Sequence, residues 1–186
     1  MNGTLRRVGD QYELRFERRL RHPPEKVWRA ITDNAELRHW FPATITGGHA
    51  PGDALRFEFV PAGPSADAEL RAMIDAQQGE IPEDSIHTRG TMRVWDPPRT
   101  LEYEWGGERL RFELTPDGAT GTRLVFVHTY GERDQTRSVG SGWEMCFDEL
   151  DARLDGRAGP PITKARFDEL SAAYAAALER VLAETR

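Results

Sequence analysis

Four short runs of alternating apolar and polar residues follow one another late in the chain, and they constrain the fold more than any other feature. The runs cover residues 87–95, 100–105, 108–115 and 122–130. Turn signals separate them, in the order Asp-Pro-Pro, Gly-Gly and Pro-Asp-Gly. Alternation with period two predicts half-buried strands, and short connections predict hairpins between them. The sequence therefore predicts an antiparallel sheet with one apolar face.

Two further strands and two short helices are predicted before these runs. Residues 11–21 and 53–60 alternate in the same way. Between them, a Pro-Pro pair ends the first strand and opens a helix at about 24–32, and Asp33 begins a second short helix in a pattern that resembles a capping box. In the 87–95 run, Met92, Val94 and Trp95 can share one face only if a β-bulge intervenes.

After residue 140 the apolar period changes to that of a helix. The apolar stripe consists of Trp143, Phe147, Leu150 and Leu154, and Gly156 is expected to close this helix. A polar stripe beside it consists of Glu144, Asp148, Asp151 and Asp155. A second helix is predicted at 162–184, with the stripe Phe167, Leu170, Tyr174, Leu178 and Val181. A sheet with one apolar face needs a cover, which the first helix can supply. We predict one α+β domain over residues 1–186, with its core at 10–157.

Residues 61–86 differ from the rest of the chain in composition. They carry six acidic residues against Arg71 alone and are rich in Ala, Gly and Pro. We predict an acidic surface insertion that is partly mobile and holds one or two helical turns at 68–76.

Overall composition excludes several classes of protein. The chain has 31 acidic and 25 basic residues, a net charge of −6, which argues against nucleic-acid binding. No apolar run reaches the roughly 20 residues of a membrane helix, and the start has no apolar segment typical of a secretion signal. The single cysteine, Cys146, excludes an internal disulfide. The five histidines show no metal-ligand spacing. We expect a cytoplasmic protein with no metal, cofactor, nucleic-acid or membrane partner.

Four segments together resemble a known family. They are PPEKVWRAITDNAELRHWF, DPPRTLEYEW, TRLVFVHTYG and GWEMCFDELDARLDG. In this order and spacing the chain resembles bacterial proteins similar to the C-terminal domain of the heat-shock ATPase activator. That branch belongs to the START-like superfamily, also called SRPBCC or polyketide cyclase-like. The resemblance implies a helix-grip fold, in which a curved antiparallel sheet of about six or seven strands wraps a long helix, here at 141–156.

Aromatic side chains on the predicted inward faces suggest a ligand cavity. If the curved sheet separates from its helix at the open end, these rings exceed what close packing can fill. The alternative is that they simply fill the core. Candidate ligand-binding residues are Trp40, Phe57, Phe59, Met92, Tyr103, Trp105, Phe112, His128, Trp143 and Phe147. Glu58, Glu104 and Glu113 fall on the polar side and are expected to face water.

Three functions are compatible with these observations. The first is binding of a small hydrophobic or aromatic molecule between the sheet and the helix. The second is an enzyme of the cyclase, dehydratase or hydrolase kind, in which His128 acts as acid or base; without it we identify no catalytic residue. The third is a protein-interaction module or homodimer that uses the insertion or the 162–184 helix. The resemblance alone does not favour chaperone activation, because nothing before Tyr12 resembles the chaperone-binding motif of the eukaryotic activators.

Overall fold

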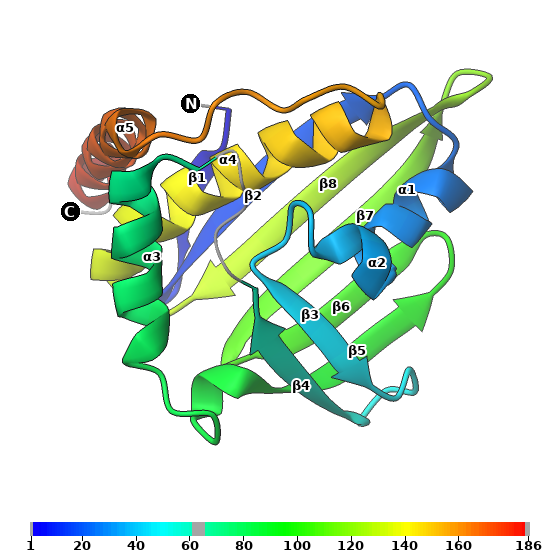
Figure 1. Cartoon of the computed structure of the whole chain (residues 1–186), viewed down its shortest axis with the longest axis horizontal. Helices are drawn as coiled ribbons and strands as arrows, with labels where there is room; N and C mark the ends of the chain where they lie inside the picture. Colours follow the sequence, from blue (N-terminus) through cyan, green and yellow to red (C-terminus); the bar gives the residue numbers. More distant parts are fainter. Residues whose placement is uncertain (1, 61–65, 185–186) are drawn as a thin grey trace.

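A curved antiparallel sheet surrounds a long helix in the computed structural model, which describes residues 2–60 and 66–184 (Figure 1). The strands are β1 (Thr4–Val8), β2 (Gln11–Leu20), β3 (Ala43–Gly47), β4 (Ala54–Phe59), β5 (Arg89–Asp96), β6 (Thr100–Trp105), β7 (Glu108–Asp117) and β8 (Gly121–Tyr130). The helices are α1 (Pro24–Thr32), α2 (Asn34–Leu37), α3 (Ala68–Gly79), α4 (Thr136–Leu154) and α5 (Lys164–Glu184), with short 3₁₀ turns η1 (Ile86–Thr88) and η2 (Arg133–Gln135).

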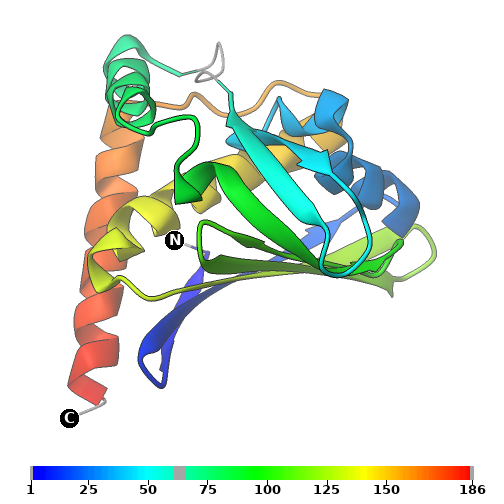
Figure 2. The same cartoon turned by 90° about the horizontal axis from the view of Figure 1, so that it is seen from below.

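The eight strands form one sheet in the order β1-β2-β8-β7-β6-β5-β4-β3. Every neighbouring pair is antiparallel. Figure 2 shows the sheet curving beneath α4, with α1 and α2 at one end and α5 standing at the other. The α+β helix-grip architecture is therefore confirmed.

The sheet has eight strands rather than about six or seven, because the two edge strands were not predicted. Most side chains of β1 are exposed, and β3 has only one fully buried residue, Ala43. An edge strand that packs little against the core carries little apolar alternation. The predicted bulge in β5 is confirmed, since the pairing with β6 shifts between Met92 and Val94.

The long helix α4 begins at Thr136, five residues before the expected start at 141. Gly140 and Gly142 both lie inside the helix. The apolar stripe that includes Trp143 and Phe147 is buried against the sheet, as predicted. Gly156 follows the helix with φ of +66°, a left-handed conformation that favours glycine.

The two short helices after β2 are also confirmed. Asp33 caps α2 by accepting a hydrogen bond from the backbone N–H of Ala35, at 2.8 Å. In a full capping box the Glu36 side chain would also accept a hydrogen bond from the backbone N–H of Asp33. That bond is absent among the described residues, because Glu36 accepts from Arg153 Nε at 3.0 Å instead. This contact joins α2 to the end of α4.

The described part of the acidic insertion is more helical than predicted, and residues 61–65 lie outside the described residues. Helix α3 extends to Gly79, beyond the one or two turns expected at 68–76. Leu70 is fully buried and packs with Met145 of α4 and Leu170 of α5. The insertion therefore adds a second small apolar cluster beside the main core.

Helix α5 packs on the body of the same chain. Leu170, Tyr174 and Leu178 of its stripe are buried, whereas Phe167 and Val181 are half-buried. Most of this stripe is thus already covered. In the described chain, no helix combines the length and apolar content required for crossing a membrane.

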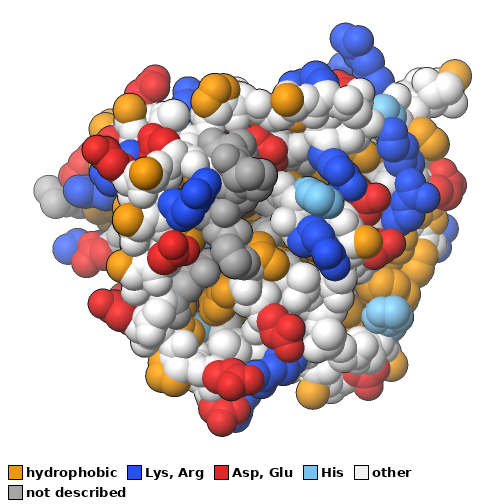
Figure 3. Space-filling view, in the orientation of Figure 1, with side chains coloured by type: hydrophobic (Ala, Val, Ile, Leu, Met, Phe, Trp, Pro, Cys, Tyr) orange, Lys and Arg blue, Asp and Glu red, His pale blue; other side chains and the backbone are white. Residues whose placement is uncertain are grey.

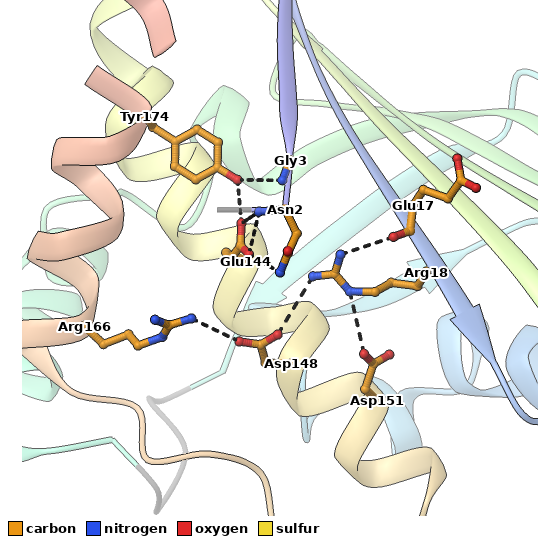
Figure 4. Close-up of polar contacts among 9 residues, drawn as sticks. All are labelled: Asn2, Gly3, Glu17, Arg18, Glu144, Asp148, Asp151, Arg166 and Tyr174. Carbon is orange, nitrogen blue, oxygen red and sulfur yellow. Dashed lines mark hydrogen bonds and ion pairs between the residues drawn. The ribbon is translucent and has the colours of Figure 1, made fainter. Parts of the chain in front are cut away.

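Three of the four acidic residues in the predicted polar stripe, Glu144, Asp148 and Asp151, are buried or half-buried (Figure 4). Glu144 is fully buried and accepts hydrogen bonds from the backbone N–H of Asn2 at 2.9 Å, from Asn2 Nδ2 at 2.6 Å and from the Tyr174 hydroxyl at 2.7 Å. Helix α5 and the start of the chain cover this face, so the carboxylate lies inside the fold. The sequence pattern identified a polar face but not its burial.

An arginine lies between the sheet and the same helix face. Arg18 shares the inward side of β2 with Phe16, and its side chain is only 10% exposed. The guanidinium is 3.6 Å from Asp151 and 3.9 Å from Asp148 (Figure 4). Burial nevertheless raises the pKa of Asp151 from its ordinary 3.8 to about 6, against the opposing effect of Arg18.

This raised pKa predicts an unusual response to pH. The folded state binds a proton at Asp151 more tightly than the unfolded state, so its contribution to stability is present below pH 4 and is lost as pH rises through 6. We expect Asp151→Asn to increase the free energy of unfolding by about 2 kcal/mol at pH 7.5 and to change it little at pH 4. Urea unfolding at both pH values measures this difference.

Glu17 on the outer face of the sheet is a control, because its pKa is shifted in the direction opposite to that of Asp151. Its ion pairs with Arg123 and Arg15 lower its pKa to about 2. Glu17→Gln should therefore lower stability at pH 7.5, with the loss shrinking as pH falls toward 2. A destabilising Asp151→Asn substitution at pH 7.5 would show that the Arg18 ion pair outweighs desolvation.

Candidate functional site

A cavity of about 830 Å³ lies between α3, α4 and the ends of strands β4, β6, β7 and β8. Figure 3 shows the face of the molecule that carries α3 and β4, where hydrophobic side chains appear between charged ones. Aromatic rings on one side are Trp40, Phe41, Phe59, Trp105 and Trp143. Aliphatic and thioether side chains on the other include Leu70, Met73, Ile74, Met145 and Ile162. This volume falls within the range of small-molecule sites.

The cavity brings together five of the ten predicted ligand-binding residues. Trp40, Phe59, Trp105, His128 and Trp143 line it. The other five belong to the packed core and are at most 3% exposed: Phe57, Met92, Tyr103, Phe112 and Phe147.

The division between lining and core residues follows the faces of α4. Phe147 packs against Phe126 and Phe16, with ring centroids 5.1 and 5.3 Å apart, so this face of the helix is in close contact with the sheet. Another face of α4 lines the cavity along most of the helix, at Val139, Gly142, Cys146 and Glu149, among others. Strand parity identifies inward residues but cannot show which of them border the cavity.

His128 is buried, and both of its ring nitrogens have partners. Trp143 Nε1 donates a hydrogen bond to Nδ1 at 2.9 Å, and Nε2 lies 2.7 Å from Glu108 Oε2. An indole nitrogen only donates, so Nδ1 must accept and the ring proton must be on Nε2. In this arrangement neither nitrogen is free to act directly as acid or base on a bound molecule. His128 is a positioning residue for Glu108.

Glu108 is a polar cavity residue that was not among the predicted site residues. It opens β7 directly after a Gly-Gly turn and has the same parity as Leu110 and Phe112. That inward parity was a usable signal. Its side chain is 27% exposed and lines the cavity.

The three glutamates that were predicted to face water do not line the cavity. Glu58 is exposed, Glu104 pairs with Arg93 and Glu113 pairs with Arg111.

Other titratable groups on the cavity wall offer less reactivity. Burial raises the pKa of the Cys146 thiol to about 12, so it is a thiol rather than a thiolate at neutral pH. Burial also raises the pKa of Glu149, whose Oε1 has no hydrogen-bond partner among the described residues. No group of three His, Cys, Asp or Glu side chains within residues 2–60 and 66–184 could hold a metal ion.

Comparison with known proteins agrees with the fold. The family model described as "Activator of Hsp90 ATPase homolog 1-like protein" matches residues 21–155, well over half of the sequence. The chain belongs to this family. The match begins just after β2 and ends at the residue that caps α4, so it covers most of the sheet, the cavity wall and the central helix. No curated protein matches the sequence significantly.

Solved structures extend the likeness to members of this START-like superfamily. The protein encoded by BPP1335 of Bordetella parapertussis is 30% identical, with a TM-score of 0.69 over 87% of this chain and 84% of its own. A protein of unknown function from Enterococcus faecalis, EF2215, is 18% identical, with a TM-score of 0.71 over 97% and 92%. The Aha1 dimer from Colwellia psychrerythraea is 18% identical, with a TM-score of 0.53 over 76% and 95%. At 18% identity the likeness shows the fold alone.

Proposed function

We propose that this protein is a cytoplasmic binding protein that takes up a small hydrophobic or aromatic molecule between α3, α4 and the sheet. The cavity of about 830 Å³ carries this proposal, because its wall is mainly aromatic and aliphatic. Binding would come mostly from removing apolar surface from water, at about 25 cal/mol per Å² before the costs of association. Polar groups on the wall would then orient the molecule.

The enzyme alternative finds less support in the geometry. His128 was its only candidate acid or base, and both ring nitrogens are occupied by Trp143 and Glu108. A group that touches a bound molecule here would be Glu108 rather than His128.

A homodimer is a second property that one comparison favours, because a solved relative of the same fold is a dimer. The stripe of α5 is a poor candidate for such an interface. Leu170, Tyr174 and Leu178 already pack within the chain. We therefore place the proposed dimer contact elsewhere than on this stripe.

Gly142 provides a test of the binding site. It lines the cavity, and a Cβ built on it meets no atom within 4 Å. We expect Gly142→Phe to fold normally and to weaken binding of the neutral probe N-phenyl-1-naphthylamine at least about tenfold, since the new ring occupies the cavity. Fluorescence titration gives the Kd, and a thermal melt checks the fold.

The matched control is Gly142→Ala, whose single methyl group leaves most of the cavity open and should preserve the Kd. Equal affinity of the Phe variant and the wild-type protein would place the probe elsewhere. If the wild-type protein binds neither this probe nor other aromatic compounds, the proposed function is wrong.

A further inference from the structure

The carboxylate of Glu108 has one occupied oxygen and one available oxygen. Oε2 is paired with His128 Nε2. Within the described part of the chain, Oε1 takes no hydrogen bond, and the side chain stands on the cavity wall. A hydrogen-bond acceptor is therefore presented to whatever fills the cavity.

Two buried residues fix the orientation of this acceptor. Trp143 is 6% exposed and His128 is 4% exposed, so neither side chain is free to rearrange in solvent. Because the indole N–H can only donate, it imposes the tautomer of His128, and the Nε2 proton then points at Glu108. The hydrogen bonds from Trp143 to His128 and from His128 to Glu108 therefore hold this acceptor in a fixed position on the cavity wall.

An aromatic surface lies directly beside this acceptor. Trp105 of β6 is the cross-strand partner of Glu108, and side chains of such pairs on one face are neighbours. The Trp105 ring lies 5.7 Å from Phe41 and 5.8 Å from Phe59, centroid to centroid. A ligand ring stacked here would place a substituent near Glu108.

We propose that Glu108 selects ligands that carry a hydrogen-bond donor, a hydroxyl or an amino group, on an aromatic body. This inference rests on the proposed function and specifies its ligand class. A ligand without a donor would leave the Glu108 oxygen desolvated and unpaired, which is the arrangement that discriminates most strongly between related molecules. His128 and Trp143 act as positioning residues.

An anionic ligand fits the part of the wall near Glu108 less well. Two of the arginines that line the cavity already have carboxylate partners, since Arg153 pairs with Glu36 at 3.0 Å and Arg157 with Asp155 at 3.4 Å. Glu108 would repel a second negative charge brought close to it.

Matched naphthalene compounds test this selectivity. We expect the wild-type protein to bind 2-naphthol about tenfold more tightly than 2-methoxynaphthalene, because only the former can donate. Binding of 2-(aminomethyl)naphthalene more tightly than 2-methoxynaphthalene would equally support the proposal and would show that a charged donor is accepted. Isothermal titration gives each Kd. Tighter binding of 2-naphthoate than of 2-naphthol would overturn the proposal.

Glu108→Gln is the diagnostic variant, because it should abolish the preference. His128 Nε2–H requires the amide oxygen of the new glutamine, so its NH₂ group must face the cavity as a donor. We expect 2-naphthol to lose at least about tenfold in affinity, whereas 2-methoxynaphthalene binds as well as before or better.

The matched control is Glu113→Gln, on the same strand but paired with Arg111 on the outer face, which should leave both affinities unchanged. If the wild-type protein binds 2-naphthol and 2-methoxynaphthalene equally, the role of Glu108 is wrong while the binding function stands. If neither compound nor N-phenyl-1-naphthylamine binds, the proposed function itself fails. Should Glu108→Gln lower the melting temperature too far for titration, the wild-type comparison alone decides.

Discussion

Replacing Gly140 by alanine is expected to lower the free energy of unfolding by about 3 kcal/mol, the upper part of the range for overpacked cores. A Cβ at this position would lie within 2.6 Å of three ring carbons of Tyr174. Such a separation is shorter than any real carbon contact, so helices α4 and α5 must separate or the ring must move. Tyr174 is fully buried and is also restrained through its hydroxyl, which leaves it little freedom to yield. Urea unfolding followed by circular dichroism measures the change.

Gly142 is the matched control two residues further along the same helix. A Cβ built there meets nothing within 4 Å. Alanine loses less backbone entropy than glycine when a helix forms, so Gly142→Ala should stabilise the protein by about 0.5–1 kcal/mol. The two substitutions are chemically identical but opposite in sign. A Gly140→Ala variant as stable as the wild-type protein would show that α5 does not dock on α4 as described.

Removing the Glu144 carboxylate is expected to lower the free energy of unfolding by about 3 kcal/mol, because three hydrogen-bond donors in or next to the interior lose their acceptor. Glu144→Ala would leave the backbone N–H and side-chain amide of Asn2 and the hydroxyl of Tyr174 without their acceptor. It would also release the start of the chain from α4. Equilibrium unfolding gives the stability, and hydrogen exchange of β1 amides reports the release.

Glu149 on the same helix is the control for this second substitution. Its Oε1 has no hydrogen-bond partner among the described residues, so Glu149→Ala removes no such contact from that oxygen and should change stability by less than about 0.5 kcal/mol. Tyr174→Phe should lower the free energy of unfolding by about 1–2 kcal/mol, which lies between the effects of the two glutamate substitutions. It deletes one of several donors to Glu144. Equal effects of Glu144→Ala and Glu149→Ala would contradict the buried network.

Local patterns were sufficient for most of the fold because each interior strand repeats its apolar face many times. The 108–115 and 122–130 runs became β7 and β8, and the bulge between Met92 and Val94 followed from parity alone. The edge strands β1 and β3 escaped notice because they bury few side chains.

The candidate site was predictable only in part. Strand parity placed His128 inward, and helical periodicity placed Trp143 inward. Parity could also have placed Glu108, which shares the parity of Leu110. Their mutual hydrogen bonds could not be predicted, because they join side chains from β7, β8 and α4. Phe112 and Phe147, by contrast, lie in the packed core although their pattern resembles that of the lining residues.

The sequence by itself determined the interior strands, the central helix and the inward face of each, because alternation and helical periodicity are properties of neighbouring residues. The tertiary structure decided what covers each face. In that structure Glu144 and Arg18 are buried, and a gap remains between α4 and the strand ends. The hydrogen bond from Trp143 sets the tautomer of His128. These outcomes depend on distances between elements far apart in the chain, and a one-dimensional pattern contains no such distances.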